Sequence, residues 1–437
     1  MRPTLIILLL ALTIGALGQN TEKKDCNKDV SDSRGKMIPW EQGAHKTGKY
    51  RNVFLDAGYS KADIDAKLAK AYYDVFEGPN RVYFEVGDSM GYVSDVKNQD
   101  ARTEGLSYGL MVAVQLNKKD VFDRLWRWTK KYMQHQSGPR EAYFAWSVDP
   151  KTGNQLSGGS ASDGELYFIT SLLFASNRWG NDTGIDYHAE AKRILDAMWS
   201  KDGTNGITNV INVEHKLITF VPDRGGYNYT DPSYHLPAFY EVWAEYGKDG
   251  REQFYRDCAD SARAYLHRAI HPETGLNPDY SEFSGKPFVR WRMGDAFRFD
   301  SWRVPMNIAM DYSWYGKDKE WQKEYAVKIQ NFLFCQGINT FVDQYTVDGK
   351  TPEWILPAGK PGVQKLRHSL GLVSTSAAAS IMGTQAKSWK FIDELWNAKL
   401  EPYEDGYFDP YYDGLLYLFS IMHLSGNYQI IKPANAK

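Results

Sequence analysis

Six short polar segments along this chain each run directly into an apolar helical stretch. They are residues 102–105, 162–165, 230–234, 299–301, 367–369 and 411–414. Ser, Thr and Asp at such positions commonly cap the free backbone N–H groups of a helix. Because the six segments recur at fairly regular spacing and several are rich in aromatic residues, we expect six helix starts to face one shared cleft. Carboxylates gathered in an aromatic cleft can hydrolyse glycosidic bonds.

Glu104 and Asp300 are the candidates for the acid and the base of such a reaction. Glu104 begins a helical stretch with Gly105 and Ser107, small residues that permit close approach, and Tyr108 one turn further on could line the floor. Asp300 lies in an aromatic and basic stretch, where a nearby arginine would keep it ionised. The alternative for Glu104 is a first-turn carboxylate stabilised by the helix dipole. The alternative for Asp300 is a helix cap.

Three further side chains suit substrate or water binding. Asp163 follows a glycine-rich approach and could hold a sugar hydroxyl. Glu165 is a rival for that role, and a capping aspartate is the alternative. Tyr234 could orient the attacking water through its hydroxyl group, although a tyrosine in such a position more often belongs to the core.

Substrate binding is also predicted for residues beside Glu104 and at one other helix start. Arg102 precedes the candidate acid, and Tyr108 follows it. Arg367 and His368 end a long loop and could bind a chain end, whereas the alternative is a solvated loop end. Candidate aromatic platforms for a sugar are Trp146, Tyr167 and Trp302.

Composition restricts the class of protein. The 437 residues are 43% hydrophobic and 24% charged, which is typical of a soluble globular protein. With a net charge of -2 and no basic run, neither a nucleic acid nor a membrane is expected as a partner. The 14 Trp and 29 Tyr suit a large helical core, and they also suit the apolar faces of sugars.

The N-terminus has the pattern of a secretory signal over residues 1–18, with Arg2 ahead of an apolar run and small residues before Gln19. We therefore expect export to the periplasm or the extracellular space. Residues 19–45 are predicted to form a polar, loosely ordered lead-in. Residues 46–437 are predicted to form one catalytic domain.

The three cysteines have no metal-ligand spacing, so no metal site and no cofactor is expected. Cys258 and Cys335 lie in predicted helices. They are interpreted as buried free thiols, with a disulfide as the alternative.

Apolar residues that recur at intervals of three and four residues predict twelve helices. Their ranges are 61–77, 104–117, 119–134, 163–177, 186–199, 231–246, 251–269, 301–315, 319–335, 370–383, 388–397 and 411–424. Every second helix, starting at 104–117, is apolar on nearly all sides and should be internal. Inner and outer helices that alternate six times favour an all-α fold, an (α/α)6 barrel. The longer loops all precede inner helices, so they should build the cleft at one end.

At these segments the chain resembles glycoside hydrolase family 8, and within it the reducing-end xylose-releasing exo-oligoxylanases. The resemblance extends from about residue 50 to residue 427 and is most specific at 84–88, 102–109, 231–237 and 271–276. It implies an (α/α)6 barrel and inversion at the anomeric carbon. It places the general acid at Glu104, the base at Asp300, a carboxylate supporting the distorted ring at Asp163 and a water-holding tyrosine at Tyr234. His368 falls where the exo-acting members have a loop histidine that closes the cleft, although a His-Pro step is familiar there.

The expected function is therefore inverting release of xylose from the reducing end of β-1,4-xylo-oligosaccharides by a monomeric enzyme. One alternative is an endo-acting xylanase or other β-1,4-glycanase of the same family. The other is a non-catalytic exported protein that binds oligosaccharides.

Overall fold

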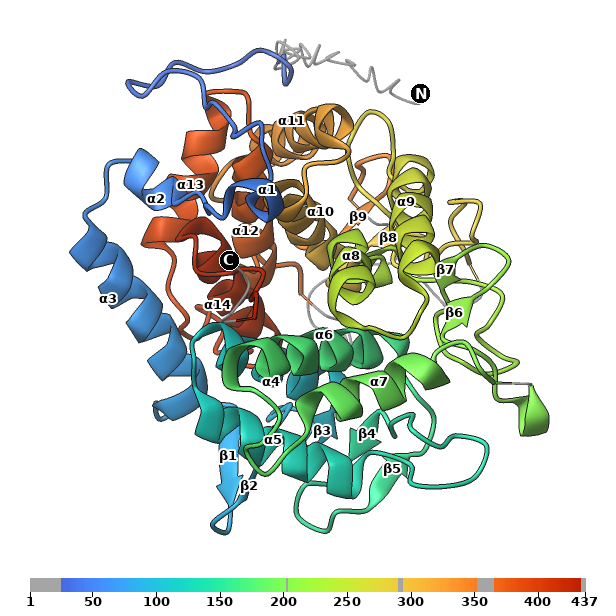
Figure 1. Ribbon diagram of the computed structural model, residues 1–437. Helices are drawn as coiled ribbons and strands as arrows, with labels where there is room; N and C mark the ends of the chain where they lie inside the picture. Colours follow the sequence, from blue (N-terminus) through green and yellow to red (C-terminus); the bar gives the residue numbers. More distant parts are fainter. Residues whose placement is uncertain (1–24, 202, 290–293, 352–364, 434–437) are drawn as a thin grey trace, which may run out of the picture.

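Six inner helices form a closed ring in the computed structural model, which describes residues 25–201, 203–289, 294–351 and 365–433 (Figure 1). The inner helices are α4 (Thr103–Gln115), α6 (Ser162–Trp179), α8 (Pro237–Tyr246), α10 (Arg303–Trp314), α12 (Leu370–Ala378) and α14 (Tyr412–Leu424). Each packs against the next, and α14 returns to α4. Most of their residues are buried, because neighbouring inner and outer helices surround them.

Six outer helices cover the ring. They are α3 (Lys61–Tyr72), α5 (Lys119–Tyr132), α7 (Tyr187–Ala197), α9 (Glu252–Ala269), α11 (Lys319–Gln336) and α13 (Lys387–Asn397). Five pack against the inner helix that precedes them, and α3 packs against α14. The predicted all-α (α/α)6 barrel and its twelve helices are confirmed.

Several helices begin or end in tighter or wider turns than the sequence predicts. Short helical pieces are α1 (Ala44–Thr47), α2 (Val53–Asp56), η1 (Tyr73–Glu77), η2 (Thr204–Gly206), η3 (Pro232–Tyr234), η4 (Phe299–Trp302) and η5 (Ala379–Met382). Among these, η3 is separated from α8 by His235 and Leu236, and Pro237 then begins α8 at a position where its missing N–H is harmless. Within the described ranges, no helix is both long and apolar enough to cross a bilayer.

The strands lie in the long loops that precede inner helices. They are β1 (Tyr83–Val86), β2 (Met90–Val93), β3 (Ala101–Arg102), β4 (Ser147–Val148), β5 (Gln155–Ser157), β6 (Ile211–Asn212), β7 (Leu217–Ile218), β8 (Ala296–Phe297) and β9 (Tyr345–Thr346). Strand β3 pairs with β4, and β8 pairs with β9, so each pair joins two successive loops. The loops therefore gather at one end, as predicted.

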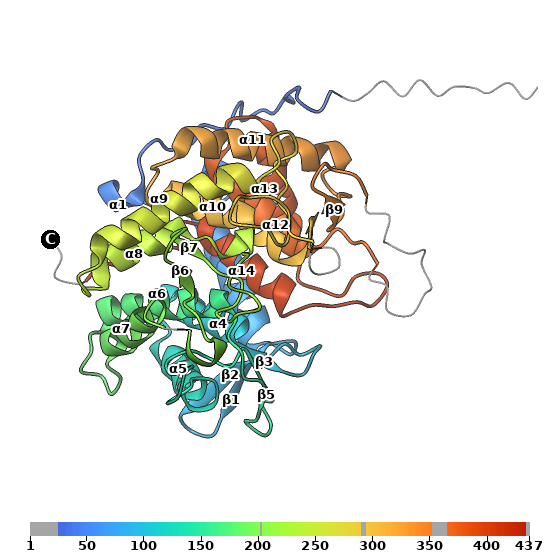
Figure 2. The same ribbon diagram turned by 90° about the vertical axis from the view of Figure 1, so that its right-hand side faces the viewer.

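The N-terminal segment differs from its prediction. Figures 1 and 2 show it running along α11. The Asp29 carboxylate accepts hydrogen bonds from the N–H groups of Ala386 and Lys387 at 2.9 and 3.1 Å, at the start of α13. Arg34 pairs with Asp393 of the same helix at 2.6 Å. The described part of the predicted lead-in is therefore attached to the barrel rather than loose, whereas the predicted signal segment 1–18 lies outside the described residues.

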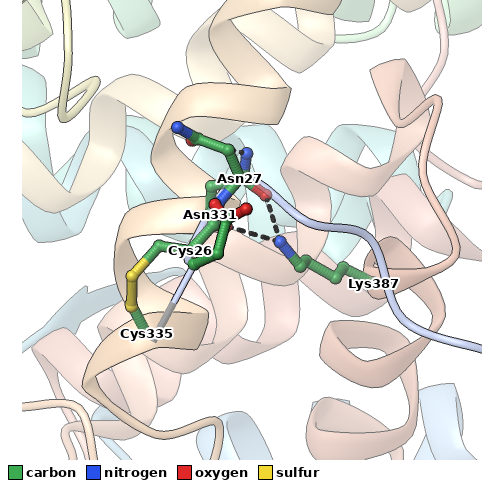
Figure 3. Close-up of a disulfide and its surroundings, with 6 residues drawn as sticks. Cys26, Asn27, Asn331, Cys335 and Lys387 are labelled. Atoms are coloured by element: carbon green, nitrogen blue, oxygen red, sulfur yellow. Dashed lines mark hydrogen bonds between the residues drawn. A yellow bond between two sulfur atoms is a disulfide. The ribbon is translucent and has the colours of Figure 1, made fainter. Parts of the chain in front are cut away.

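A disulfide joins Cys26 to Cys335 at the C-terminal end of α11 (Figure 3). The expectation that Cys335 is a free thiol is wrong, and Cys258 alone is buried and unpaired. Lys387 adds a hydrogen bond to the carbonyl oxygen of Cys26 at 2.6 Å. The two bridged cysteines are 309 residues apart, so their spacing in the sequence carries no sign of the bond.

Candidate active site

Side-chain capping explains little of the six polar helix starts. Asp231 caps its helical turn by accepting a hydrogen bond from the Ser233 N–H at 2.7 Å. At the starts of α4, α6, η4, α12 and α14, the side chain of the N-cap residue accepts no hydrogen bond. The capping alternative for Asp300 is therefore excluded, and the carboxyl groups of Glu104, Asp163 and Asp300 meet elsewhere.

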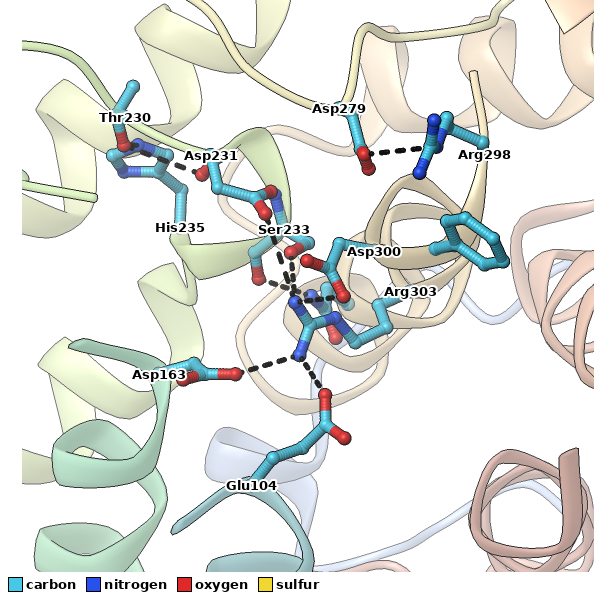
Figure 4. A network of polar contacts seen from close by, with 12 residues as sticks. Glu104, Asp163, Thr230, Asp231, Ser233, His235, Asp279, Arg298, Asp300 and Arg303 are labelled. Atoms are coloured by element: carbon cyan, nitrogen blue, oxygen red, sulfur yellow. Dashed lines mark hydrogen bonds and ion pairs between the residues drawn. The ribbon is translucent and has the colours of Figure 1, made fainter. Parts of the chain in front are cut away.

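They meet at Arg303, a buried arginine in the first turn of α10 (Figure 4). One terminal nitrogen, Nη1, lies 3.2 Å from Glu104 Oε2 and 3.0 Å from Asp163 Oδ2. The same nitrogen donates a hydrogen bond to the Tyr108 hydroxyl at 2.9 Å. This single guanidinium therefore ties together the starts of α4, α6 and α10.

The other terminal nitrogen of Arg303, Nη2, faces a second set of groups. It lies 3.1 Å from Asp300 Oδ1 and donates to Ser233 Oγ at 2.8 Å. Asp231 Oδ2 is 3.9 Å away. Four carboxyl groups thus surround one positive charge, so they cannot all be ionised without strong mutual repulsion.

Glu104 has the properties of a proton donor. The Tyr411 hydroxyl donates to its Oε1 at 2.9 Å, and Arg303 contacts its Oε2. Burial raises the pKa of Glu104 to about 8, the charges of Asp163 and Asp300 also raise it, and Arg303 and Tyr411 oppose the rise. A carboxyl group with this pKa carries its proton at neutral pH, as general acid catalysis requires.

Asp300 is the carboxyl group at the guanidinium that water reaches most easily. Its side chain is 27% exposed, against 17% for Glu104 and 8% for Asp163. The preceding residue, Phe299, has a φ of +36°, a strained value that turns the chain sharply into η4. The Tyr412 hydroxyl holds this turn by donating to the Phe299 carbonyl oxygen at 2.9 Å.

Glu104 and Asp300 contact opposite terminal nitrogens of one guanidinium. The two contact distances and the width of that group therefore place the facing carboxyl oxygens no more than about 9 Å apart. An inverting glycosidase needs about 6.5–9.5 Å between its carboxyl groups to admit a water molecule. The geometry is compatible with that arrangement.

Asp163 and Tyr234 lie beside this pair. Burial raises the pKa of Asp163 above its usual range, and Arg303 opposes the rise. The Tyr234 ring lies 5.5 Å from the Arg303 guanidinium carbon. Burial and then the charges of Asp163, Asp231 and Asp300 raise the pKa of Tyr234. Its hydroxyl is therefore a neutral donor close to these carboxyl groups.

No individual role was predicted for Arg303, Asp231 or Asp279, beyond the expectation that an arginine near Asp300 keeps it ionised. Arg303 follows Asp300 by three residues, the spacing at which helical side chains share a face, and this signal could have identified it. Asp231 and Asp279 are fully or almost fully buried, and burial raises the pKa of both well above the usual range. Asp279 lies in a long loop without helical periodicity, and only the fold brings it near Asp300.

Arg102 and Tyr108, both predicted to bind substrate, have different surroundings. Arg102 lines the cleft, and its guanidinium is fixed by Asp95 and Asp100 at 3.1 Å each. Tyr108 is buried among aromatic rings and accepts a hydrogen bond from Arg303. It therefore supports Arg303 and does not face the cleft.

The structure does not bring His368 to the cleft. Its ring nitrogens lie 2.8 Å from the Phe341 carbonyl oxygen and 3.1 Å from Glu394 of the outer helix α13. Both nitrogens are therefore engaged by protein groups, one of them on the outer helix α13. Arg367 pairs with Asp405 at 2.8 Å and does not line the cleft directly.

Two predicted aromatic platforms are core residues instead. Tyr167 and Trp302 are buried, and the Trp302 indole donates to the Asp343 carbonyl oxygen. Trp146 is partly exposed and carries the Arg102 guanidinium 5.6 Å above its ring.

Glu165, the rival of Asp163, is fully buried and turns away from Arg303. Its carboxyl group accepts a hydrogen bond from the Phe144 N–H at 3.3 Å.

A cavity of about 310 Å³ opens beside Glu104 and Asp300. Its remaining walls are Asp95, Lys97, Asn98, Arg102, Phe299, Tyr407, Asp409, Tyr411 and Tyr412. These residues come from three different loops, so the cavity is a product of the fold.

Comparison with known proteins gives matches over most of the chain. Residues 89–355 match the model of glycosyl hydrolases family 8. The chain is 39% identical to the reducing-end xylose-releasing exo-oligoxylanase Rex8A of Paenibacillus barcinonensis, over 89% of this chain and 98% of that protein. It is also 39% identical to a reducing end xylose-releasing exo-oligoxylanase of Halalkalibacterium halodurans, over 90% of this chain and 97% of that protein.

A solved structure gives the same result. A Rex8A variant complexed with an arabinofuranosyl-xylotetraose superimposes with a TM-score of 0.82 at 38% identity. The match covers 90% of this chain and all of that one.

Proposed function

The chain belongs to glycoside hydrolase family 8, and within this family we propose that it releases xylose from the reducing end of β-1,4-xylo-oligosaccharides with inversion. The observation that carries the proposal is the placement of a protonated Glu104 and a water-accessible Asp300 at the two ends of the Arg303 guanidinium. The names of the two relatives and the xylotetraose backbone bound by Rex8A support the choice of substrate.

The proposed reaction is a single displacement. Glu104 donates its proton to the glycosidic oxygen as the bond to the anomeric carbon breaks. Asp300 removes a proton from a water molecule, whose oxygen attacks the anomeric carbon from the opposite face. The leaving sugar departs with a new hydroxyl group, and the donor sugar gains a hydroxyl of inverted configuration.

Asp163 and Tyr234 are assigned to the donor side of the bond. Both lie close to Arg303, and neither is among the residues that line the cavity beside Glu104 and Asp300. We assign Asp163 to a hydroxyl of the distorted ring. The neutral Tyr234 hydroxyl is assigned to the attacking water.

Arg303 balances the charge of the reaction. Before the reaction Glu104 is neutral and Asp300 is ionised, and afterwards their states are exchanged. Because both contact the same guanidinium, the net charge around Arg303 is the same at the start and the end. The site therefore needs no large reorganisation to stabilise the products, which favours catalysis.

We also propose that the protein is exported to the periplasm or the extracellular space through the predicted signal at residues 1–18. The Cys26–Cys335 disulfide supports it, since such bonds persist in oxidising compartments outside the cytosol. Mass spectrometry of the protein recovered from the periplasm or the medium should give a mature N-terminus at Gln19. A chain that keeps Met1 and stays in the cytosol would contradict export.

The product pattern tests the proposed activity. Xylotetraose labelled at its reducing end should yield labelled xylose first, together with unlabelled xylotriose. Labelled xylobiose or xylotriose as the first product, with rapid cleavage of polymeric xylan, would indicate an endo-acting enzyme. Binding without any cleavage would indicate a non-catalytic protein.

A further inference from the structure

Tyr407 is held in the wall of the cleft by two cations from other loops. The Lys97 ammonium lies 4.3 Å from the centre of its ring and donates a hydrogen bond to its hydroxyl at 3.2 Å. The Arg367 guanidinium carbon lies 4.0 Å from the same ring centre. Contacts of cations with an aromatic ring are attractive, so both fix the position of this ring.

Both loops that supply the cations are themselves anchored. Arg367 pairs with Asp405 at 2.8 Å, two residues before Tyr407. The turn that carries Lys97 is closed by Asp95, which accepts from the Asn98 N–H at 3.0 Å. Tyr407 therefore joins the loops that precede α4, α12 and α14, three neighbouring helices of the ring.

Tyr407 and Lys97 line the same cavity as Glu104 and Asp300, whereas Asp163 does not. Because the donor sugar is assigned to Asp163, which does not line this cavity, we assign the cavity to the leaving sugar. The cavity of about 310 Å³ has room for one leaving pyranose ring.

We propose that Tyr407, fixed by Lys97 and Arg367, closes the cleft one sugar beyond the cleaved bond and so limits the product to a single xylose. The proposal rests on the function proposed above and identifies which residues restrict it. The family resemblance implies His368 for this closure, but its imidazole contacts Phe341 and Glu394 instead. Its neighbour Arg367 contributes by holding Tyr407.

Tyr407→Ala tests the proposal with xylopentaose labelled at its reducing end. The wild type should release labelled xylose almost alone. Removal of the ring should raise the ratio of labelled xylobiose to labelled xylose at least tenfold, because a second sugar can pass the open wall. Tyr407→Phe keeps the ring and its cation contacts and should keep the wild-type product ratio. Tyr73→Ala, a change at an exposed tyrosine outside the cleft, is the matched control.

The outcomes separate the two proposals. A wild type that does not release labelled xylose contradicts the proposed function itself. A wild type that does, together with a folded Tyr407→Ala variant of unchanged product ratio, overturns the role of Tyr407 alone. If Tyr407→Ala does not fold, the Lys97→Met and Arg367→Met double variant replaces it. That variant frees the ring, so an unchanged product ratio there would also overturn the proposal.

Discussion

Arg303 decides the chemistry at the scale of single residues. It provides one positive charge for four carboxyl groups, so some of these groups must hold protons. Burial raises the pKa of Glu104 to about 8, so its carboxyl group carries a proton at neutral pH. One buried cation can thus position an acid and a base that require opposite protonation states.

Glu104→Gln should reduce turnover on xylotriose by at least about 100-fold, because the amide has the same shape but no proton of suitable acidity to donate. The variant should bind xylotriose and unfold at nearly the wild-type temperature. Initial rates measured by chromatography, with calorimetric binding as the control, test the assignment. Turnover close to that of the wild type would show that Glu104 is not the acid.

Tyr411→Phe should shift the alkaline limb of the pH profile of kcat/KM to higher pH. The Tyr411 hydroxyl donates to Glu104 Oε1, which stabilises the ionised form and lowers the pKa of Glu104. Activity needs protonated Glu104 and is lost as pH rises through its pKa, so removing the donor extends activity upward from about pH 8.

Tyr412→Phe is the matched control, because the Tyr412 hydroxyl donates to the Phe299 carbonyl oxygen instead. The alkaline limb of the pH profile of Tyr412→Phe should not move to higher pH. A downward shift in Tyr411→Phe would contradict the hydrogen-bond argument.

Part of the cluster of side chains around Arg303 was predicted from the sequence. Glu104, Asp163, Asp300 and Tyr234 come together as their shared position at helix starts indicated, although their individual roles stay predictions. The orientation of His368 could not be predicted, because it depends on partners 26 and 27 residues away in the sequence.

At the scale of elements, glycines at the helix starts allow the catalytic side chains to approach. A Cβ on Gly105 would lie 2.5 Å from Cε2 of Tyr411, and one on Gly164 would lie 2.6 Å from the Thr103 Cβ. The small residues after Glu104 were predicted to permit close approach. In the structure they permit close approach between elements of the barrel.

Gly105→Ala should therefore lower kcat by roughly tenfold or more, since a misplacement of about 1 Å near the chemistry can cost 100-fold. The added methyl group displaces Tyr411 and removes its hydrogen bond to Glu104. Gly158→Ala is the control, because its Cβ would meet only ordinary contacts at 3.5 and 4.0 Å. Equal kcat for Gly105→Ala and the wild type would contradict the packing argument.

Cys26→Ser should lower the free energy of unfolding by about 2–4 kcal/mol, because it opens a long covalent loop. Its effect on kcat should be small, since the disulfide lies on α11 and not in the cleft. Thermal unfolding with and without dithiothreitol measures this effect. The reductant should destabilise the wild type but leave Cys26→Ser unchanged, and an equal response of the two proteins would contradict the bridge.

The helix positions could be predicted from the sequence because apolar periodicity is a local pattern. All twelve helices lie where this pattern predicted them. The attachment of the N-terminal segment to the barrel could not be predicted from the sequence. It depends on Asp29 meeting α13 and on Cys26 meeting α11, and both partners are more than 300 residues away.

At the scale of the whole molecule, the closed ring explains why the site is rigid. Each inner helix packs on its two neighbours, so the six helix starts keep fixed distances from one another. The bond-cleaving groups come from α4 and from η4 at the start of α10, which are not neighbours in the ring. The expected monomeric state stays a prediction.

The stereochemistry of the first product tests the central claim most directly. Proton NMR during hydrolysis of xylotriose should show the new reducing end of xylobiose appearing as the α-anomer, before mutarotation forms the β-anomer. This result follows if water enters between Asp300 and the sugar ring opposite Glu104. Initial formation of the β-anomer would mean that the two carboxyl groups act as a retaining pair, at about 5–5.5 Å, and would contradict the account.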